Sequence, residues 1–188
     1  MHWKLPEPRL KFLEDTNEWM NLTRSYLACT TFVDAQLKRV LDALVANHAY
    51  MTMAPILQHD ERDWWRVVDT NLSGTFHLVQ AVLPHMRRVG EGRIVVITSE
   101  WGVTGWPDAT AYAASKAGLN GLTRDLAQQW TGRKGIRVNA IAPGFFTSEM
   151  TEQYPPGYLE QQQSRIPAGR KGDPRELAAA VVFLAPAA

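Results

Sequence analysis

The stretch Arg93–Thr98, which reads RIVVIT, decides the fold of this 188-residue chain. It is a short apolar run with turn residues before it at Gly90 and Gly92. Such runs are typical of a strand that is buried on both faces of a parallel sheet. Ala43–Ala46 and Ile136–Ile141 are two further runs of this kind. We therefore expect these three segments to form parallel strands of one sheet.

Helical patterns separate the predicted strands. After Asp60, a candidate N-cap, apolar residues recur at helical spacing as far as Met86, and Pro84 is expected to bend or stop that helix. A second helix is predicted from about Thr110 to Trp130, and Asp173-Pro174 predicts the start of a last one. Strands that alternate with helices of this length favour an α/β, doubly wound parallel sheet with helices on both faces.

The carboxyl ends of the predicted strands mark the expected ligand-binding edge. Right-handed crossovers bring these ends together, and ligands of open α/β sheets bind there. Ala46-Asn47, Ser99 and Pro143-Gly144 follow the three strands. Residues 145–172 are expected to be irregular, with room for a short helix.

Composition narrows the class of protein. Apolar residues make up 45% of the chain and charged residues 21%, as in a globular domain. Twenty basic residues against 19 acidic ones leave a net charge of +1, which gives no electrostatic reason to expect nucleic acid or a membrane as a partner. Cys29 is the single cysteine, and no run is long and apolar enough for a membrane span. We expect a cytoplasmic protein.

Tyr112 and Lys116 form the pair that indicates chemistry. They lie four residues apart on a predicted helix and therefore on one face. A nearby cation favours phenolate, so Lys116 is expected to lower the pKa of Tyr112. Such a tyrosine can donate a proton to a carbonyl or take one from an alcohol. The pattern is short, and a surface tyrosine beside a solvated lysine is the simpler interpretation of the pair alone.

Two more polar residues belong to the same candidate site. Ser99 ends its strand at the edge where the tyrosine helix begins, and its hydroxyl could hold a substrate carbonyl beside Tyr112. A serine at a strand end can equally satisfy local backbone. Asn71 interrupts an apolar stripe of the helix that follows Asp60. Its alternative role is that of a buried amide that repairs a helix distortion.

Taken together, these residues closely resemble the short-chain dehydrogenase/reductase family. The order and spacing of four segments carry the resemblance, which runs from about Asp42 to Ala185. The segments are Asp69–Phe76 (DTNLSGTF), Gly92–Ser99 (GRIVVITS), Ala111–Gly118 (AYAASKAG) and Ile136–Gly144 (IRVNAIAPG).

The resemblance implies an activity and a role for each site residue. It implies an oxidoreductase that interconverts an alcohol and a carbonyl with NAD or NADP. The cofactor would carry out the hydride transfer. Tyr112 would be the general acid/base, Lys116 its pKa partner and a ribose ligand, and Ser99 the substrate orienter. Asn71 would anchor a water through which protons reach Lys116. Further cofactor contacts are implied for four residues: Asn47, Pro143, Gly144 and Ser148.

The resemblance also implies surroundings for this site. Aromatic residues near the predicted edge would wall the substrate pocket, although such residues are often only core: Trp101, Trp106, Phe145 and Phe146. The helices that begin after Asp60 and at Thr110 form the usual subunit interface of the family. They imply a homo-oligomer, either a dimer or a tetramer.

The chain departs from the family at both ends. Its first glycine is Gly74, whereas a dinucleotide site usually opens with a glycine-rich turn. The family's Asn-Asn-Ala-Gly segment appears as Ala46-Asn47-His48-Ala49. We interpret residues 1–40 as an atypical N-terminal segment and 41–188 as one α/β domain, in which the first βαβ unit and the last strand are not recognisable. The alternative to an enzyme is a truncated, non-catalytic relative that serves as a binding module.

Overall fold

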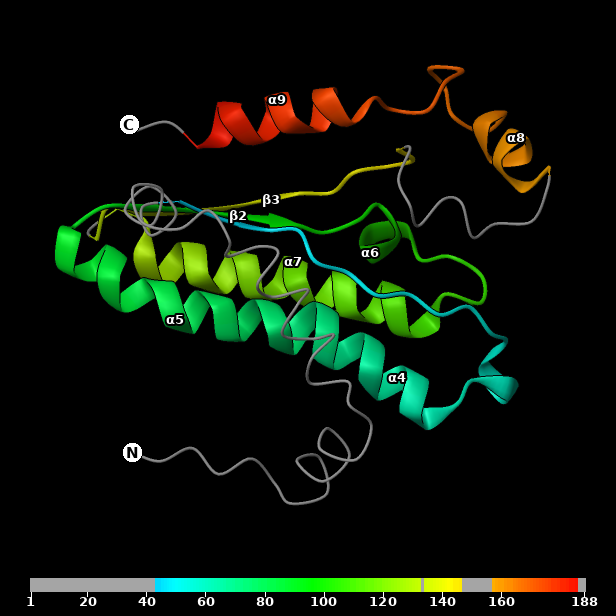
Figure 1. Cartoon of the computed structure of the whole chain (residues 1–188), viewed down its shortest axis with the longest axis horizontal. Helices are drawn as coiled ribbons and strands as arrows, with labels where there is room; N and C mark the ends of the chain where they lie inside the picture. Colours follow the sequence, from blue (N-terminus) through cyan, green and yellow to red (C-terminus); the bar gives the residue numbers. More distant parts are fainter. Residues whose placement is uncertain (1–42, 133, 147–156, 186–188) are drawn as a thin grey trace. The chain divides into compact units, whose positions relative to one another are not determined.

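The structure is a computed structural model that describes residues 43–132, 134–146 and 157–185 (Figure 1). All of these residues belong to one compact unit, Val40–Ala188. The predicted N-terminal segment 1–40 and the candidate cofactor ligand Ser148 lie outside the described residues. In chain order the elements are β1 (Ala43–Ala46), the 3-10 turn η1 (Ile56–Gln58), α4 (Glu61–Val68), the π-helical segment η2 (Asp69–Ser73), α5 (Gly74–Val89), β2 (Gly92–Ile97), α6 (Trp101–Thr104), α7 (Thr110–Trp130), β3 (Ile136–Ile141), α8 (Tyr158–Gln163) and α9 (Pro174–Leu184).

The three predicted strands form one parallel sheet in the order β1-β2-β3. Leu44 pairs with Ile94, and Ile94 pairs with Val138, so the strands are in register with their carboxyl ends at one edge. Every residue of the central strand β2 is buried, as its apolar run predicted. The sequence interpretation as an incomplete α/β, Rossmann-like parallel sheet is confirmed.

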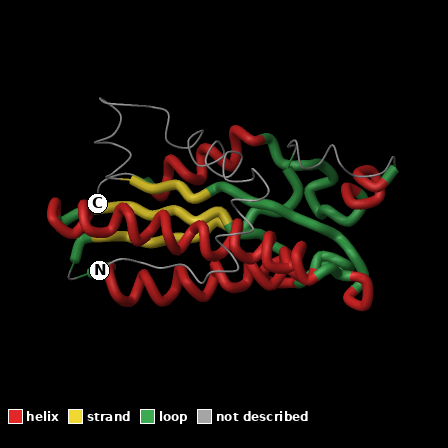
Figure 2. Tube along the Cα trace, turned by 60° about the horizontal axis from the view of Figure 1, so that its bottom comes forward, coloured by secondary structure: helices red, strands yellow, loops and turns green. Residues whose placement is uncertain are grey.

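Helices lie on both faces of the sheet. Figures 1 and 2 show α5 and α7 running along one face, with α4 continuing the line of α5, while α9 lies across the other face. On the α5 and α7 side, Ile94 and Val96 pack in a cluster that includes Met86 of α5 and Leu119 of α7. The α9 side is less closed among the described residues, because Val45 of β1 remains 42% exposed.

The helix termini follow local sequence rules. Asp60 caps α4 through its side chain, which accepts a hydrogen bond from the Arg62 backbone N–H. Asp173 and Glu176 form a capping box at the start of α9, with Pro174 in the first turn. These two predicted helix starts are confirmed.

Pro84 does not stop the helix that contains it. α5 runs on to Val89 and ends where Gly90 adopts a left-handed conformation with φ 84°. Proline inside a helix costs about 3 kcal/mol or more. Packing of Val82 and Met86 against the sheet offsets this cost, because both side chains are buried on the same face. Of the two effects expected of Pro84, a bend or a stop, the structure contradicts the stop, because α5 continues past Pro84 to Val89.

Within the described residues, no helix combines the length and the apolar character that a bilayer span requires.

Candidate active site

The candidate site lies at the carboxyl edge of the sheet, where the strands end in three loops. Hydrogen bonds continue the pairing of β2 and β3 past their last residues. The Thr98 N–H donates to the Ile141 carbonyl at 2.8 Å, and the Glu100 N–H donates to the Pro143 carbonyl at 3.0 Å. The loop that carries Ser99 and the loop that carries Pro143-Gly144 are therefore held side by side, as the parallel topology predicted.

Lys116 is a buried cation at this edge. Its side chain projects from α7, is only 2% exposed, and donates from Nζ to the carbonyl of Ile97, the last residue of β2, at 2.8 Å. Nζ lies 5.6 Å from the centroid of the Tyr112 ring. Burial lowers the pKa of Lys116 to about 8, because the low-dielectric surroundings disfavour the ammonium. A lysine kept in this position is poised to exchange a proton near neutral pH.

The close approach of α6 to α7 depends on a glycine. A Cβ on Gly102 would lie 2.7 Å from the Lys116 backbone carbon and 2.9 Å from its Cβ. No other residue could bring α6 this close to Lys116 without displacing the helix. The hydroxyl of Ser99 accepts the N–H of Trp101 at 3.2 Å, so the start of α6 also orients this serine.

Tyr112 meets Ser99 across the site. Burial raises the pKa of the Tyr112 hydroxyl, and a hydrogen bond with the Ser99 side chain partly lowers it again. The expected lowering by Lys116 is thus not what the structure shows. Desolvation of the phenol outweighs the other contributions to its pKa. Burial also lowers the pKa of Lys116, and its Nζ donates to the Ile97 carbonyl.

Asn71 lies on the π-helical segment η2 and is fully buried. Its amide clamps the loop after β1, since Oδ1 accepts the Tyr50 N–H at 2.7 Å and Nδ2 donates to the Tyr50 carbonyl at 2.9 Å. Nδ2 also donates to Ser115 Oγ at 2.9 Å. The helix distortion that the sequence suggested is present. The Asn71 side chain uses its hydrogen bonds to join the loop after β1 to α7.

Sequence analysis did not identify the two partners of Asn71, Ser115 and Tyr50. Ser115 lies inside the Tyr112–Lys116 segment, and its hydroxyl donates to the Tyr112 carbonyl at 2.8 Å. Its place one turn after Tyr112, on the buried face of α7, is the signal that could have found it. Tyr50 contributes only its backbone to the clamp, so no residue type could have revealed it.

An aromatic group adjoins the tyrosine. The Trp101 ring is stacked on Trp106 at 5.0 Å and meets Tyr112 edge-on at 5.8 Å. Trp106 donates from Nε1 to the hydroxyl of Tyr158 at 3.1 Å. The Trp101 and Trp106 rings thus form an apolar wall beside the phenol of Tyr112. Phe145 packs against the same cluster, whereas Phe146 bridges to Gly172, which its ring contacts closely.

The candidate cofactor ligands lie along the same edge. Asn47 directly follows β1 and is exposed, and Gly144 is exposed after β3. A Cβ on Gly144 would lie 3.1 Å from Oε2 of Glu100, so the glycine leaves room beside that carboxylate. Burial raises the pKa of Glu100. Asn47, Pro143 and Gly144 therefore lie at the same carboxyl edge of the sheet as Ser99.

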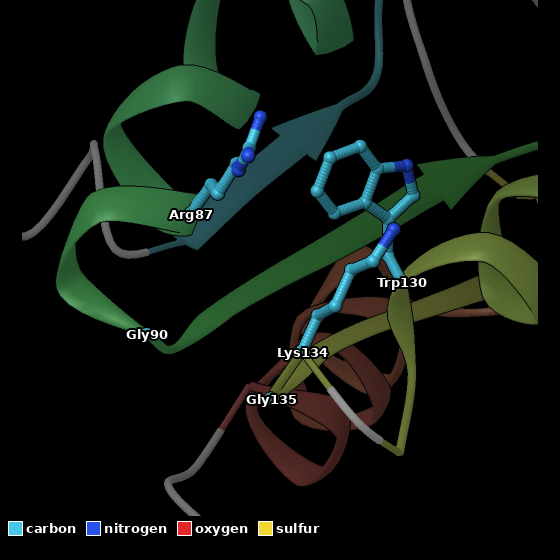
Figure 3. Close-up of a pocket in the computed structure, with 5 residues that line it drawn as sticks. All are labelled: Arg87, Gly90, Trp130, Lys134 and Gly135. Atoms are coloured by element: carbon cyan, nitrogen blue, oxygen red, sulfur yellow. The ribbon is translucent and has the colours of Figure 1, made fainter.

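A pocket of about 460 Å³ lies away from this site (Figure 3). Its lining residues adjoin the amino ends of β2 and β3: Arg87, Gly90, Trp130, Lys134 and Gly135. Arg87 is in the last turn of α5, and Lys134 lies over the Trp130 ring at 4.2 Å, just beyond the end of α7. A helix carboxyl end stabilises a cation, which accounts for the position of Arg87. None of the predicted catalytic residues lines this pocket.

Comparison with known proteins identifies close relatives. A family model described as enoyl-(acyl carrier protein) reductase matches residues 24–188. The 3-oxoacyl-(acyl-carrier-protein) reductase FabG of Thermotoga maritima is 44% identical over 145 residues, which cover 77% of this chain and 58% of that protein.

Solved structures extend the comparison. The gluconate 5-dehydrogenase from Burkholderia cenocepacia, in complex with NADP and tartrate, superposes with a TM-score of 0.75 at 35% identity, covering 78% of this chain and 58% of that one. An NAD+-bound xylitol dehydrogenase gives a TM-score of 0.73 at 30% identity, with 81% and 67% covered. The chain spans less than two thirds of the curated relatives it matches, 58% of the Thermotoga maritima FabG and 64% of that of Staphylococcus aureus.

Proposed function

The chain belongs to the short-chain dehydrogenase/reductase family, and on this premise we propose that it is an NAD- or NADP-dependent oxidoreductase that interconverts an alcohol and a carbonyl. The observation that carries the proposal is the buried group of Ser99, Tyr112 and Lys116 at the carboxyl edge of the sheet. The relatives are named as reductases and dehydrogenases, so the alternative of a non-catalytic binding module has no support among them.

The residues of the edge fit the nicotinamide end of such a cofactor. A phenol and an ammonium share the carboxyl edge of the sheet with an exposed glycine, Gly144, and an exposed amide, Asn47, which suits a polar ribose and carboxamide. When bound, a nicotinamide would supply hydride-transfer chemistry that no side chain can. Tyr112, Lys116, Asn47, Pro143 and Gly144 would hold it. The part of the chain that the structure describes contains no glycine-rich turn for the pyrophosphate.

Tyr112 is proposed as the residue that moves the proton. Because burial raises its pKa, the hydroxyl is protonated at neutral pH and can donate to a substrate carbonyl oxygen. Taking a proton from an alcohol needs the phenolate, so alcohol oxidation should accelerate as the pH rises toward the pKa of Tyr112. Ser99 would hold the substrate oxygen beside the phenol, since its side chain acts on the Tyr112 hydroxyl and partly lowers its pKa.

Lys116 and Asn71 support this proton transfer in different ways. The ammonium of Lys116 stabilises negative charge as it develops on Tyr112. Asn71 is proposed as a positioning residue, because its amide fixes the loop after β1 against α7. Its predicted role as an anchor for a proton-carrying water stays a prediction.

The substrate is proposed to be a small alcohol or carbonyl compound that lies against the wall of Trp101 and Trp106. The names of the relatives span an acyl thioester, a sugar acid and a polyol, and these define the panel to assay. We also infer a homo-oligomer, either a dimer or a tetramer. The exposure of Trp65 (43%) on α4 and of Phe76 (40%) on α5 supports it. Light scattering that finds only monomers would contradict this inference.

The test of the proposed function begins with binding. Titration of the purified chain with NADH and NADPH, followed by nicotinamide fluorescence and tryptophan quenching, should show saturable binding. Turnover is then measured with the substrate panel for the wild type, Tyr112→Phe and Tyr50→Phe. Tyr112→Phe should lose activity by two orders of magnitude or more, on the scale typical of general acid/base catalysis.

Tyr50→Phe is the matched control. Tyr50 acts on the site through its backbone, so removal of its hydroxyl should leave turnover close to that of the wild type. A folded chain that binds neither cofactor up to millimolar concentration would overturn the proposed function. Unchanged activity of Tyr112→Phe would overturn the assignment of the proton-transfer residue.

A further inference from the structure

Glu100 is an ionisable side chain of the site to which the proposed proton transfer assigns no role. It stands between Ser99, whose side chain acts on the Tyr112 hydroxyl, and Trp101, which forms part of the aromatic wall. The residue is exposed at the carboxyl edge of the sheet, shortly after β2. An acidic group therefore adjoins both the residue that orients the substrate and the wall against which the substrate would lie.

The backbone of Glu100 is fixed from two sides. Its N–H donates to the Pro143 carbonyl at 3.0 Å, and its carbonyl accepts the Val103 N–H at 2.8 Å and the Thr104 N–H at 2.9 Å. Glu100 is also the N-cap residue of α6, yet its side chain makes no capping hydrogen bond. The backbone thus sets the position of the residue, while the carboxylate gives α6 no hydrogen bond.

The carboxylate of Glu100 lies against Gly144, in the loop after β3. A Cβ on Gly144 would lie 3.1 Å from Oε2 and 3.7 Å from Oε1, so both oxygens face the side of the glycine that has no side chain. A larger residue at this position would crowd the carboxylate. The glycine therefore leaves room for an acidic group between the loop after β2 and the loop after β3.

This carboxylate has unused capacity to accept hydrogen bonds. Within the part of the chain that the structure describes, it takes part in no hydrogen bond and no ion pair. Desolvation raises the pKa of Glu100, which shows that the carboxylate has lost part of its water. An ionised carboxyl group can accept about four hydrogen bonds. A ligand that brings hydroxyl groups would replace the hydrogen bonds that desolvation removes.

We propose that Glu100 selects the substrate, because its carboxylate accepts a hydrogen bond from a second hydroxyl on the carbon next to the reacting one. The substrate class is thus a neutral vicinal diol or polyol, or the corresponding hydroxy-carbonyl compound. The apolar wall of Trp101 and Trp106 suits the C–H groups of such a compound. A substrate with a carboxylate in place of the second hydroxyl is disfavoured, because two negative charges repel each other. This inference deepens the proposed function and rests on it.

The first test compares three secondary alcohols that differ in one group beside the carbinol. Isopropanol has a methyl group there, propylene glycol a hydroxymethyl group, and lactate a carboxylate. The wild type should prefer propylene glycol to isopropanol by about tenfold to a hundredfold in kcat/KM, which is the range of a hydrogen bond to a charged group. Lactate should be the poorest substrate of the three.

Two variants and a matched control identify the group responsible. Glu100→Met keeps the length of the side chain without an oxygen acceptor, and it should reduce the preference for propylene glycol to about one. Glu100→Gln keeps a neutral acceptor, so it should show an intermediate preference, and lactate should improve. Glu61→Gln removes an exposed charge from the first turn of α4 and keeps an acceptor for Trp65 Nε1, so its preferences should match those of the wild type.

Binding gives a second readout that needs no turnover. Propylene glycol should quench tryptophan fluorescence saturably, because Glu100 adjoins Trp101, and Glu100→Met should bind it about tenfold more weakly. Binding that depends on Glu100 without any turnover would overturn the proposed function and leave the diol site standing. Turnover with no preference for propylene glycol, or with a preference that Glu100→Met retains, would overturn this inference alone.

Two further outcomes would also refute the inference. One is a folded wild type that neither prefers nor binds propylene glycol. The other is weaker NADH binding by Glu100→Gln with an unchanged preference among the alcohols, since that result would assign the carboxylate to the cofactor.

Discussion

Substitution of Lys116 by methionine should make the stability of the chain respond differently to pH. The folded-state pKa of Lys116 is about 8, against 10.5 for the unperturbed side chain. Between these values the unfolded chain binds more protons than the folded chain, so the stability that depends on Lys116 rises as the pH rises. Below pH 8 the folded protein carries a buried ammonium and bears the full penalty.

The size of the effect follows from the same two values. The fall from 10.5 to about 8 corresponds to roughly 3 kcal/mol at about 1.36 kcal/mol per pH unit. Integrated from pH 7 to pH 9.5, the wild type should gain about 2 kcal/mol of unfolding free energy relative to Lys116→Met. The contribution of Tyr112 largely cancels, because both proteins contain it.

Urea unfolding followed by tryptophan fluorescence measures this difference. Both proteins are unfolded at pH 7 and at pH 9.5, and the free energies of unfolding are compared at each pH. Loss of the hydrogen bond to the Ile97 carbonyl changes the free energy of unfolding by the same amount at both pH values, so it does not alter the comparison. If the free energies of unfolding of the two proteins differ by the same amount at both pH values, the conclusion that burial lowers the pKa of Lys116 is refuted.

Two further predictions concern neutral residues of the site. Asn71→Ala should destabilise the chain by about 2–4 kcal/mol, because the N–H and carbonyl of Tyr50 both lose their partner, and thermal unfolding would reveal it. Gly102→Ala should lower both stability and turnover, since its Cβ would collide with the Lys116 backbone. Gly121→Ala is its control: no atom lies within 4 Å of a Cβ there, so this change within α7 should stabilise the helix by about 0.5–1 kcal/mol, and an equal loss in both variants would contradict the steric argument.

Much of the fold was predictable from local pattern. The runs Ala43–Ala46 and Ile136–Ile141 are strands with the predicted bounds, and α7 covers the predicted Thr110–Trp130. Periodicity and turn residues report these elements because burial requires one apolar face in a helix and two in a central parallel strand. The short helix α6 was missed, since Gly102 and Gly105 read as a loop.

The site was predictable in its membership but not in its energetics. Spacing placed Tyr112 and Lys116 on one helix face, and strand ends placed Ser99 and Pro143-Gly144 at one edge. The predicted direction of the Tyr112 pKa shift was wrong. A sequence motif reveals the charge of Lys116, but it does not reveal how far burial removes the phenol from water. Burial is set by everything that packs around a group, including residues remote in the sequence.

Asn71 shows the same division most clearly. Its residue type and its place on an apolar stripe mark it from sequence as a buried amide with a task. Its partners, the Tyr50 backbone and Ser115, lie 21 and 44 residues away along the chain and are decided only when η2, the β1 loop and α7 meet. Local sequence determines which elements form and which residues they carry, because propensity and periodicity act over a few turns. Distances and pKa values belong to the tertiary structure, because they arise from contacts between elements that no local pattern contains.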